Sequence, residues 1–131
     1  MAILHSHHIA LKATDYARSK AFYTEVLGFP IVGQIPGKDV VFIDIGGTTI
    51  ELMQGTSGDA CHPSCGFMHL AFEVDDVDAT YADLLMKGVE FFVEPKNVGD
   101  IRLAFFRDPD GNELELFQSP TLTWKRGLAR G

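Results

Sequence analysis

His8-Ile-Ala-Leu11 and His69-Leu-Ala-Phe72 are near-copies of one stretch, and the similarity between the two regions continues beyond it. An aspartate follows each histidine by seven positions (15 − 8 and 76 − 69), and a helical stretch then leads to a glycine. Each copy ends in a strand-like segment with one glutamate among apolar residues, Thr-Ile-Glu51-Leu-Met and Glu-Leu-Glu115-Leu-Phe. The chain is thus a tandem repeat in which each unit carries one histidine and one glutamate at matched places.

The spacing of apolar residues predicts the element order βαβββ in both units. In the first unit we expect a strand over 5–13, a helix of about a dozen residues that Thr14 or Asp15 caps and Gly28 ends, and strands over 29–34, 40–45 and 48–54. In the second unit we expect a strand over 66–74, a helix that Asp75 or Asp76 caps and Gly88 ends, and strands over 89–94, 101–107 and 113–118. Aspartate is a typical helix N-cap and glycine a typical helix end.

The repeat predicts an α+β fold of two tandem βαβββ modules. We expect one domain over residues 1–131, with module one at about 5–54, a linker at 55–65, module two at about 66–118 and a tail at 119–131. A lone module would leave one sheet face exposed, so modules must pair within the chain or between chains. We expect a homodimer, because pairing across two chains closes two sites at once.

The bulk properties narrow the class of partner. The chain has 131 residues and a formal net charge of −7, which argues against nucleic acid and against an anionic membrane as partners. No apolar run approaches the length of a membrane span, and the first residues lack the basic-then-apolar layout of a signal peptide. We therefore expect a cytoplasmic protein that acts on a small-molecule substrate.

Two cysteines, Cys61 and Cys65, lie with His62 in the predicted linker. A structural zinc site needs four ligands, and a second pair is missing. A cytosolic setting disfavours a disulfide between them. We interpret both as plain loop thiols. The tail, with Trp124, is expected either to cover an edge or a partner as a short helix or to fray.

Strand parity places both repeated histidines, His8 and His69, opposite the bulky apolar side chains of their strands. We expect those apolar residues to pack on the helix, which leaves the histidines on the other, concave face. Glu51 and Glu115 lie between large apolar neighbours, where a carboxylate is costly to bury unless something compensates its charge. A divalent ion bound by two imidazoles and two carboxylates would do so, and Zn²⁺, Ni²⁺, Co²⁺, Mn²⁺ or Fe²⁺ suit that set.

A single strand histidine is more often a packed residue than a metal ligand, and a single strand glutamate usually faces solvent. Repetition at matched places in both units reverses that preference for the set of four. His5 and His7 have no counterparts in the second unit. We interpret them as surface residues, or at most as neighbours of the site.

These motifs resemble those of the vicinal oxygen chelate superfamily, the fold of glyoxalase I, methylmalonyl-CoA epimerase, extradiol dioxygenases and fosfomycin-resistance enzymes. The resemblance covers nearly everything from His8 to Gln118 and includes Leu27-Gly-Phe29 and the turn Asp108-Pro-Asp-Gly-Asn112. It implies that the two modules form a curved mixed sheet around a metal-binding cavity. It also implies that the metal ligands are His8, Glu51, His69 and Glu115. A His/Glu/His/Glu set looks like that of glyoxalase I, and the short chain resembles the compact bacterial glyoxalases, which are often activated by nickel or cobalt.

The resemblance implies proton transfer beside a metal-chelated carbonyl, as in a lyase or isomerase that acts on the adduct of a 2-oxoaldehyde and a thiol. Glu115 is the implied general base and then acid, with Glu51 as its catalytic partner on the opposite face. Glyoxalase I binds glutathione partly through an arginine and an asparagine, whose places here hold Lys12 and Gly55. Lysine lacks the bidentate fork of arginine.

Arg102 and Arg107, on the strand before the Asp-Pro-Asp-Gly turn, are alternative contacts for a substrate anion, and equally they are solvated charges. The fold supports two other functions. One is an epimerase or dioxygenase, and the other is a non-catalytic protein that sequesters a drug, as bleomycin-resistance proteins do. The latter generally lack the metal set, so metal content separates the enzymatic from the non-enzymatic hypothesis.

Overall fold

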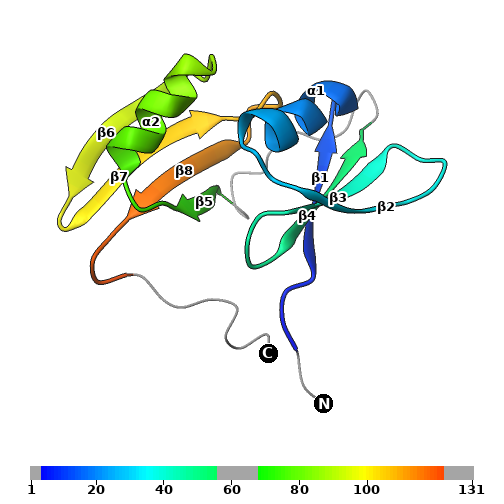
Figure 1. Cartoon of the computed structure of the whole chain (residues 1–131), viewed down its shortest axis with the longest axis horizontal. Helices are drawn as coiled ribbons and strands as arrows, with labels where there is room; N and C mark the ends of the chain where they lie inside the picture. The colour runs from blue at the N-terminus through cyan, green and yellow to red at the C-terminus, as the bar shows by residue number, and fades with distance from the viewer. Residues whose placement is uncertain (1–3, 56–67, 123–131) are drawn as a thin grey trace. The chain divides into compact units, whose positions relative to one another are not determined.

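The computed structural model describes residues 4–55 and 68–122, and the chain divides into two compact units that contain one of these ranges each. We call them unit one and unit two (Figure 1). Most of the predicted linker, with Cys61 and Cys65, and the tail beyond residue 122, with Trp124, lie outside the described residues. Within the described ranges, no helix is long and apolar enough to cross a membrane.

Unit one has the predicted βαβββ order. Its elements are β1 (His8–Ala13), α1 (Tyr16–Ala21), which continues as the π-helical turn η1 (Phe22–Val26), β2 (Ile31–Gln34), β3 (Val40–Asp44) and β4 (Thr49–Gln54). The sheet order is β1-β4-β3-β2, with β1 parallel to β4 and the remaining pairs antiparallel. The sheet is therefore mixed, as predicted.

Unit two repeats this architecture. Its elements are β5 (Leu70–Glu73), α2 (Val77–Met86), β6 (Phe91–Val98), β7 (Ile101–Arg107) and β8 (Glu113–Gln118). The sheet order is β5-β8-β7-β6, and again only the first pair is parallel. The fold is α+β, and the two four-stranded sheets are equivalent strand for strand.

The repeated aspartates begin the helices. Asp15 and Asp76 both have extended backbone, and each side chain accepts a hydrogen bond from the backbone N–H three residues later, at 3.1 Å and 3.0 Å. The helices end at Gly28 and Gly88, whose φ angles of +80° and +87° are left-handed and favour glycine. The shared Asp and Gly positions of the repeat are thus helix signals.

Several elements differ from the sequence prediction. Strands β1, β2 and β5 are shorter than expected, because they begin at His8, Ile31 and Leu70 and not at residues 5, 29 and 66. The first helix is not a uniform α-helix, because Leu27 N–H donates to the carbonyl of Phe22, five residues back, and this widens the last turn. Strand β6 continues beyond the predicted end at residue 94 to Val98. Proline is tolerated at position 95 because β6 is an edge strand. Its outer side has no neighbouring strand with which the missing N–H would pair.

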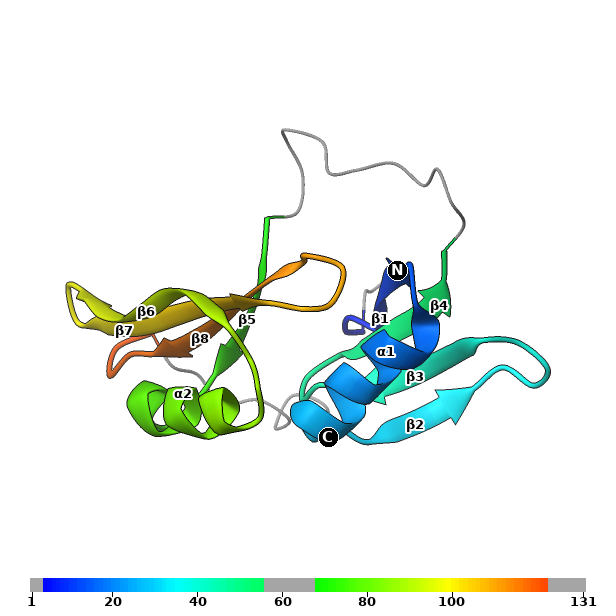
Figure 2. The same cartoon turned by 90° about the horizontal axis from the view of Figure 1, so that it is seen from above.

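One face of each sheet forms the core beneath its helix (Figure 2). In unit one, Val41, Ile43, Ile50 and Leu52 are at most 1% exposed and lie with Tyr23 of η1. In unit two the apolar residues that are at most 5% exposed are Ala104, Phe106, Leu114 and Leu116 of the sheet and Val77 and Leu84 of α2. Because neighbours along a strand alternate, the residues between these point to the opposite face of each sheet.

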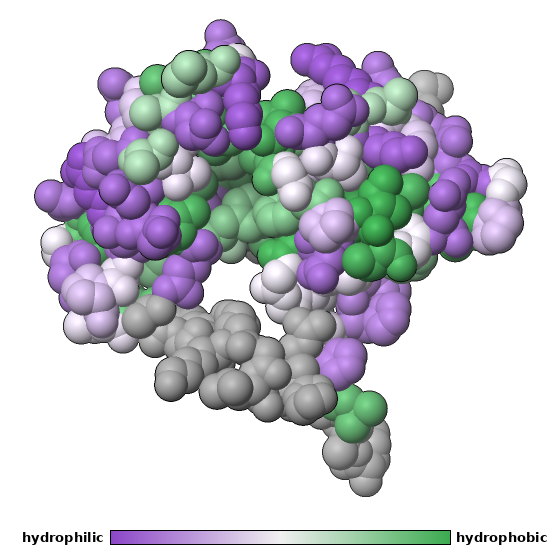
Figure 3. Space-filling model, viewed as in Figure 1, coloured by the Kyte–Doolittle hydropathy of each residue, from purple (hydrophilic) through white to green (hydrophobic). Residues whose placement is uncertain are grey.

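Apolar side chains also lie on the surface. In unit one, Ile31 and Val32 of the edge strand β2 are 42% and 58% exposed, and Figure 3 shows an apolar area over β2 and β3 among hydrophilic surroundings. In unit two, Phe92 of the edge strand β6 is 41% exposed. Both of these edge strands therefore expose large apolar side chains.

Candidate metal centre

In unit one the sheet register brings a histidine and a glutamate onto the face away from α1. Ala10 of β1 and Phe42 of β3 both pair with Glu51 of β4, and His8 lies two residues before Ala10 on the same face. The His8 Nε2 atom is 3.4 Å from a carboxylate oxygen of Glu51. Strand parity predicts this shared face, and the structure places the two side chains in contact.

Unit two builds the equivalent pair from the equivalent strands. Ala71 of β5 and Phe105 of β7 both pair with Glu115 of β8, and His69 directly precedes β5. The His69 Nε2 atom is 3.0 Å from a carboxylate oxygen of Glu115. The structure therefore brings together His69 with Glu115 as it brings together His8 with Glu51.

Each histidine ring is held by a phenylalanine from the third strand of its sheet. The His8 ring meets Phe42 edge to face with 5.6 Å between the ring centroids, and the His69 ring meets Phe105 in the same way at 5.3 Å. These two phenylalanines were not among the predicted site residues. They could have been predicted from the alternation of side chains along β3 and β7, since Phe42 lies on the face of Glu51 and Phe105 on the face of Glu115.

The two pairs differ in exposure. The side chains of His8 and Glu51 are 38% and 17% exposed, against 29% and 8% for His69 and Glu115. Burial raises the pKa of Glu115, and the facing His69 imidazole opposes part of that rise. A carboxylate with a raised pKa is a stronger base, so Glu115 is better suited than an exposed carboxylate to accept a proton.

His8 has a second imidazole beside it. The Nδ1 atoms of His7 and His8 are 2.9 Å apart, and the two rings meet edge to face with 5.2 Å between their centroids. One Nδ1 must carry the hydrogen for this contact to be a hydrogen bond. When His8 carries it, the His8 Nε2 atom is left unprotonated and faces Glu51. His7 is therefore a neighbour of the site, one of the two interpretations that the sequence left open.

The donor set of the two pairs fits a divalent ion. In each pair the imidazole Nε2 and a carboxylate oxygen point at one another, and these are the atoms through which both side chains bind metals. Each pair offers one imidazole nitrogen and one carboxylate, and among residues 4–55 and 68–122 no group of three or more His, Cys, Asp or Glu side chains is placed to hold a metal ion.

The three predicted substrate contacts lie in different settings. Lys12 is on the same face of β1 as His8 and is paired in register with Met53. Arg102 lies on the helix side of β7, where its guanidinium donates to both carboxylate oxygens of Asp78 at 2.7 Å and 3.0 Å. The structure therefore does not bring Arg102 to the face of His69 and Glu115, because Asp78 belongs to α2.

Arg107 lies on the other face of the same strand. It pairs in register with Glu113, which shares the face of Glu115, and its guanidinium stacks on the ring of Phe92. Of the two arginines, Arg107 is thus the one on the face of the unit-two pair.

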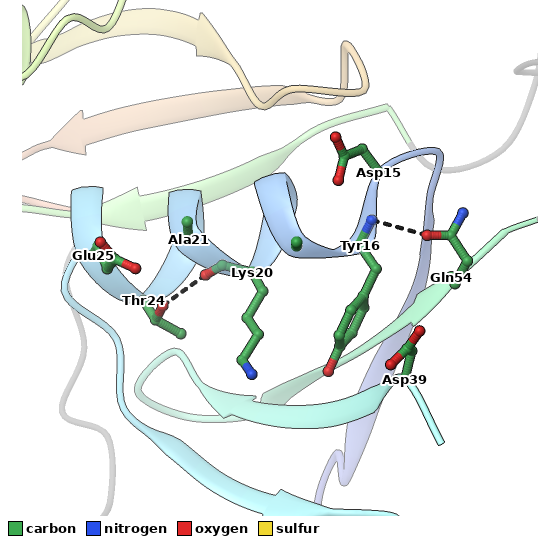
Figure 4. A pocket seen from close by; sticks show the side chains of 9 residues that line it. Asp15, Tyr16, Lys20, Ala21, Thr24, Glu25, Asp39 and Gln54 are labelled. Carbon is green, nitrogen blue, oxygen red and sulfur yellow. Dashed lines mark hydrogen bonds between the residues drawn. The ribbon is translucent and has the colours of Figure 1, made fainter. Parts of the chain in front are cut away.

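A separate groove of about 570 Å³ runs along α1. Figure 4 shows Tyr16, Lys20 and Asp39 around it, with the Tyr16 N–H donating to the Gln54 side chain at 3.0 Å. Burial, and then the charge of Asp39, raise the pKa of Tyr16. None of the four predicted metal ligands lines this groove, which lies on the helix side of the unit-one sheet.

Known proteins resemble this chain in sequence and in structure. The chain is 40% identical over 123 residues to the "Uncharacterized protein YaeR" of Escherichia coli, which covers 86% of this chain and 94% of the relative. It is 31% identical over 122 residues to a "Probable lactoylglutathione lyase" of Vibrio parahaemolyticus, which covers 86% of this chain and 88% of the relative.

Among solved structures, the antibiotic binding protein TnmS3 from Streptomyces sp. CB03234 superimposes with a TM-score of 0.74 at 32% identity, covering 91% of this chain and 98% of that one. The profile of the Glyoxalase/Bleomycin resistance protein/Dioxygenase superfamily matches residues 5–116, which include both histidine–glutamate pairs. The chain therefore belongs to the Glyoxalase/Bleomycin resistance protein/Dioxygenase superfamily.

Proposed function

We propose that this protein is a metal-dependent lyase or isomerase of the glyoxalase type. The observation that carries the proposal is the matched pair of contacts, His8 with Glu51 and His69 with Glu115, on equivalent faces of equivalent sheets. Two such pairs in one chain have a simple common explanation if all four side chains hold one divalent ion. Its substrate would be a small molecule with a carbonyl, such as the adduct of a 2-oxoaldehyde and a thiol.

The ion, held by His8, Glu51, His69 and Glu115, would be Ni²⁺, Co²⁺, Zn²⁺, Mn²⁺ or Fe²⁺. It supplies positive charge that polarises a substrate carbonyl oxygen and makes the neighbouring C–H more acidic. We further propose that the chain acts as a homodimer, since a two-fold axis brings the units of two chains together in two equivalent places.

Glu115 would move the proton. Its carboxylate takes the hydrogen from the carbon beside the carbonyl, so that a C–H bond breaks and an O–H bond forms on the side chain. The same O–H then returns its proton to the neighbouring carbonyl carbon, while the hydroxyl hydrogen of the first carbon passes to the former carbonyl oxygen, which leaves the substrate isomerised and the protein unchanged. Low exposure suits Glu115 to this role, because few water molecules can compete with the substrate for a carboxylate that is 8% exposed. Glu51 would be the catalytic partner from the other pair.

The test combines metal content with turnover. Protein loaded with Ni²⁺ or Zn²⁺ is assayed with methylglyoxal in the presence of glutathione or of other thiols, beside Glu115→Gln and the control Glu94→Gln. Glu94 is exposed and faces Tyr81 of α2, away from the pair. We expect turnover in the wild type and the control, and a loss of at least about a hundredfold in Glu115→Gln, since general acid–base catalysis contributes about 10²–10⁴-fold. Full turnover by a metal-loaded Glu115→Gln variant would contradict the assignment.

A second function has support of its own. TnmS3, an antibiotic binding protein, covers 91% of this chain, so a protein that binds a small molecule without changing it is the alternative. This alternative predicts that the purified chain takes up no divalent ion and turns over none of the adducts. Uptake of iron with consumption of oxygen would instead support a dioxygenase, and exchange of a substrate α-proton with solvent would support an epimerase.

A further inference from the structure

The most informative side chain outside the two pairs is Arg107. Strand β7 carries two arginines on opposite faces, and their surroundings differ. The Arg102 guanidinium donates hydrogen bonds to both carboxylate oxygens of Asp78, at 2.7 Å and 3.0 Å, and to the side-chain oxygen of Asn97 at 3.2 Å. The Arg107 side chain is 48% exposed, and among the described residues its one carboxylate neighbour is Glu113, at 3.7 Å. That distance is longer than a hydrogen bond.

A contact with an aromatic ring orients the Arg107 guanidinium, although the guanidinium makes no hydrogen bond to Glu113. Its central carbon lies 3.8 Å from the centroid of the Phe92 ring, within the distance of a cation–π contact. Stacking of this kind holds the flat group by its face and leaves the N–H donors around its edge directed outward. An arginine held in this way has lost part of its rotamer freedom before any ligand arrives, so binding a carboxylate costs less entropy.

A continuous aromatic surface connects Arg107 with the unit-two pair. Phe92 lies against Phe105 with 5.7 Å between the ring centroids, and Phe105 lies against His69 at 5.3 Å. Arg107 pairs in register with Glu113, two residues before Glu115 on the same strand. At about 3.3 Å per residue the two positions are about 7 Å apart along the sheet. A small molecule could therefore reach both of them while its apolar part covers the two phenylalanines.

We propose that Arg107 binds a carboxylate of the substrate, and that Phe92 and Phe105 form the wall for the apolar part between this carboxylate and the reacting carbon. The inference deepens the proposed function and rests on it for the position of the reacting carbon. A carboxylate fits better than a phosphate, because Glu113 and Glu115 share this face and repel a dianion more strongly than a monoanion. The chain as a whole carries a net charge of −7, so an acidic substrate needs a local cation such as Arg107.

The test compares two probes that differ in one group. Binding of 2-oxoadipate and of 2-oxohexanoate to Ni²⁺-loaded protein is measured by titration calorimetry. Both have the same 2-oxo acid end and six carbons, and only the first has a distal carboxylate. We expect 2-oxoadipate to bind the wild type at least about tenfold more tightly, since a hydrogen bond to a charged group is worth that much or more.

The variants assign this preference to one side chain. Arg107→Met, which keeps the apolar stem, should bring the ratio of the two affinities close to one. Arg107→Lys should keep part of it, because the charge remains but the bidentate fork is lost. Arg102→Met is the matched control from the other face of β7 and should keep the wild-type ratio. Thermal unfolding of each variant confirms that it is folded.

The inference is overturned if Arg107→Met keeps the preference, or if Arg102→Met loses it equally. Elemental analysis of the same samples separates this failure from failure of the proposed function, because a chain that takes up no metal fails the latter. If the chain takes up no metal, the role of Arg107 is tested on metal-free protein by comparing the binding of 4-phenylbutanoate with that of 4-phenylbutan-1-ol in the same calorimetric assay. A preference for the acid that disappears in Arg107→Met supports the carboxylate contact, and equal binding of both probes by the wild type refutes it.

Discussion

Removing the His7 imidazole should weaken metal binding although His7 is not a proposed ligand. The His7 and His8 Nδ1 atoms are 2.9 Å apart, and the His8 Nε2 atom faces Glu51 at 3.4 Å. Binding through Nε2 requires a neutral His8 ring with its hydrogen on Nδ1. His8 then donates to His7, and this contact fixes both the tautomer and the direction of the ligand ring.

The size of the effect follows from the contact. Loss of the hydrogen-bond partner of a metal-binding histidine typically lowers metal affinity about 10–100-fold. Both His7 and His8 are exposed, so water replaces part of the lost contact. We therefore expect His7→Ala to lower the affinity for Zn²⁺ by about tenfold, the low end of this range.

The assay is calorimetric titration of Zn²⁺ into the metal-free full chain. His7→Asn should recover most of the affinity, since its side-chain oxygen can accept the same hydrogen bond. His5→Ala is the matched control, because the His5 ring contacts the backbone of Ser6 and not His8. The reasoning is refuted if His7→Ala binds Zn²⁺ as tightly as the wild type, or if His5→Ala loses as much affinity as His7→Ala does.

Three further predictions concern unit two. Phe106 is fully buried, so Phe106→Ala should lower the free energy of unfolding by about 3–5 kcal/mol in urea titrations. Asp76→Ala removes the N-cap of α2, whose side chain accepts from Ala79 N–H, and should cost about 1 kcal/mol in the same assay. The hydrogen bond from Arg102 lowers the pKa of Asp78 below its ordinary 3.8, so this contact stabilises the fold above pH 3.8 and is lost as the pH falls through the lowered pKa. The difference in melting temperature between wild type and Asp78→Asn should therefore be present at pH 5 and shrink as the pH falls below 3.8, and a constant difference would contradict the role of this ion pair.

The repeat predicted most of the fold because its signals are local. Asp15 and Asp76 cap helices with their own side chains, and glycines end those helices, so the boundaries are readable from the sequence. Strands β7 and β8 have their predicted bounds. The π-helical turn after Ala21 was not predicted, since a hydrogen bond five residues back leaves no pattern in the apolar spacing. The extension of β6 past Glu94 was also missed, because Pro95 and the polar residues after it resemble a loop.

Parity along a strand predicted the candidate site in part. It placed His8 with Glu51 and His69 with Glu115 on shared faces, and the structure brings each pair into contact. The same rule separates Arg102 from Arg107, since an odd number of steps along a strand reverses the face, although both arginines were expected to be equivalent substrate contacts. The contact of His7 with His8 could not be predicted, because His7 precedes β1 and strand alternation does not apply to it.

The central claim is that the four side chains of the two pairs hold one divalent ion. Metal content after loading with Ni²⁺ or Zn²⁺ and dialysis tests it most directly, measured for the wild type, His8→Ala, His69→Ala and the control His5→Ala. Each chain contributes two histidine–glutamate pairs, and four ligands hold one ion, so we predict one ion per chain in the wild type and the control. Both His8→Ala and His69→Ala should lose most of it. A wild-type chain without metal, or either of these two variants with a full complement, would contradict the account.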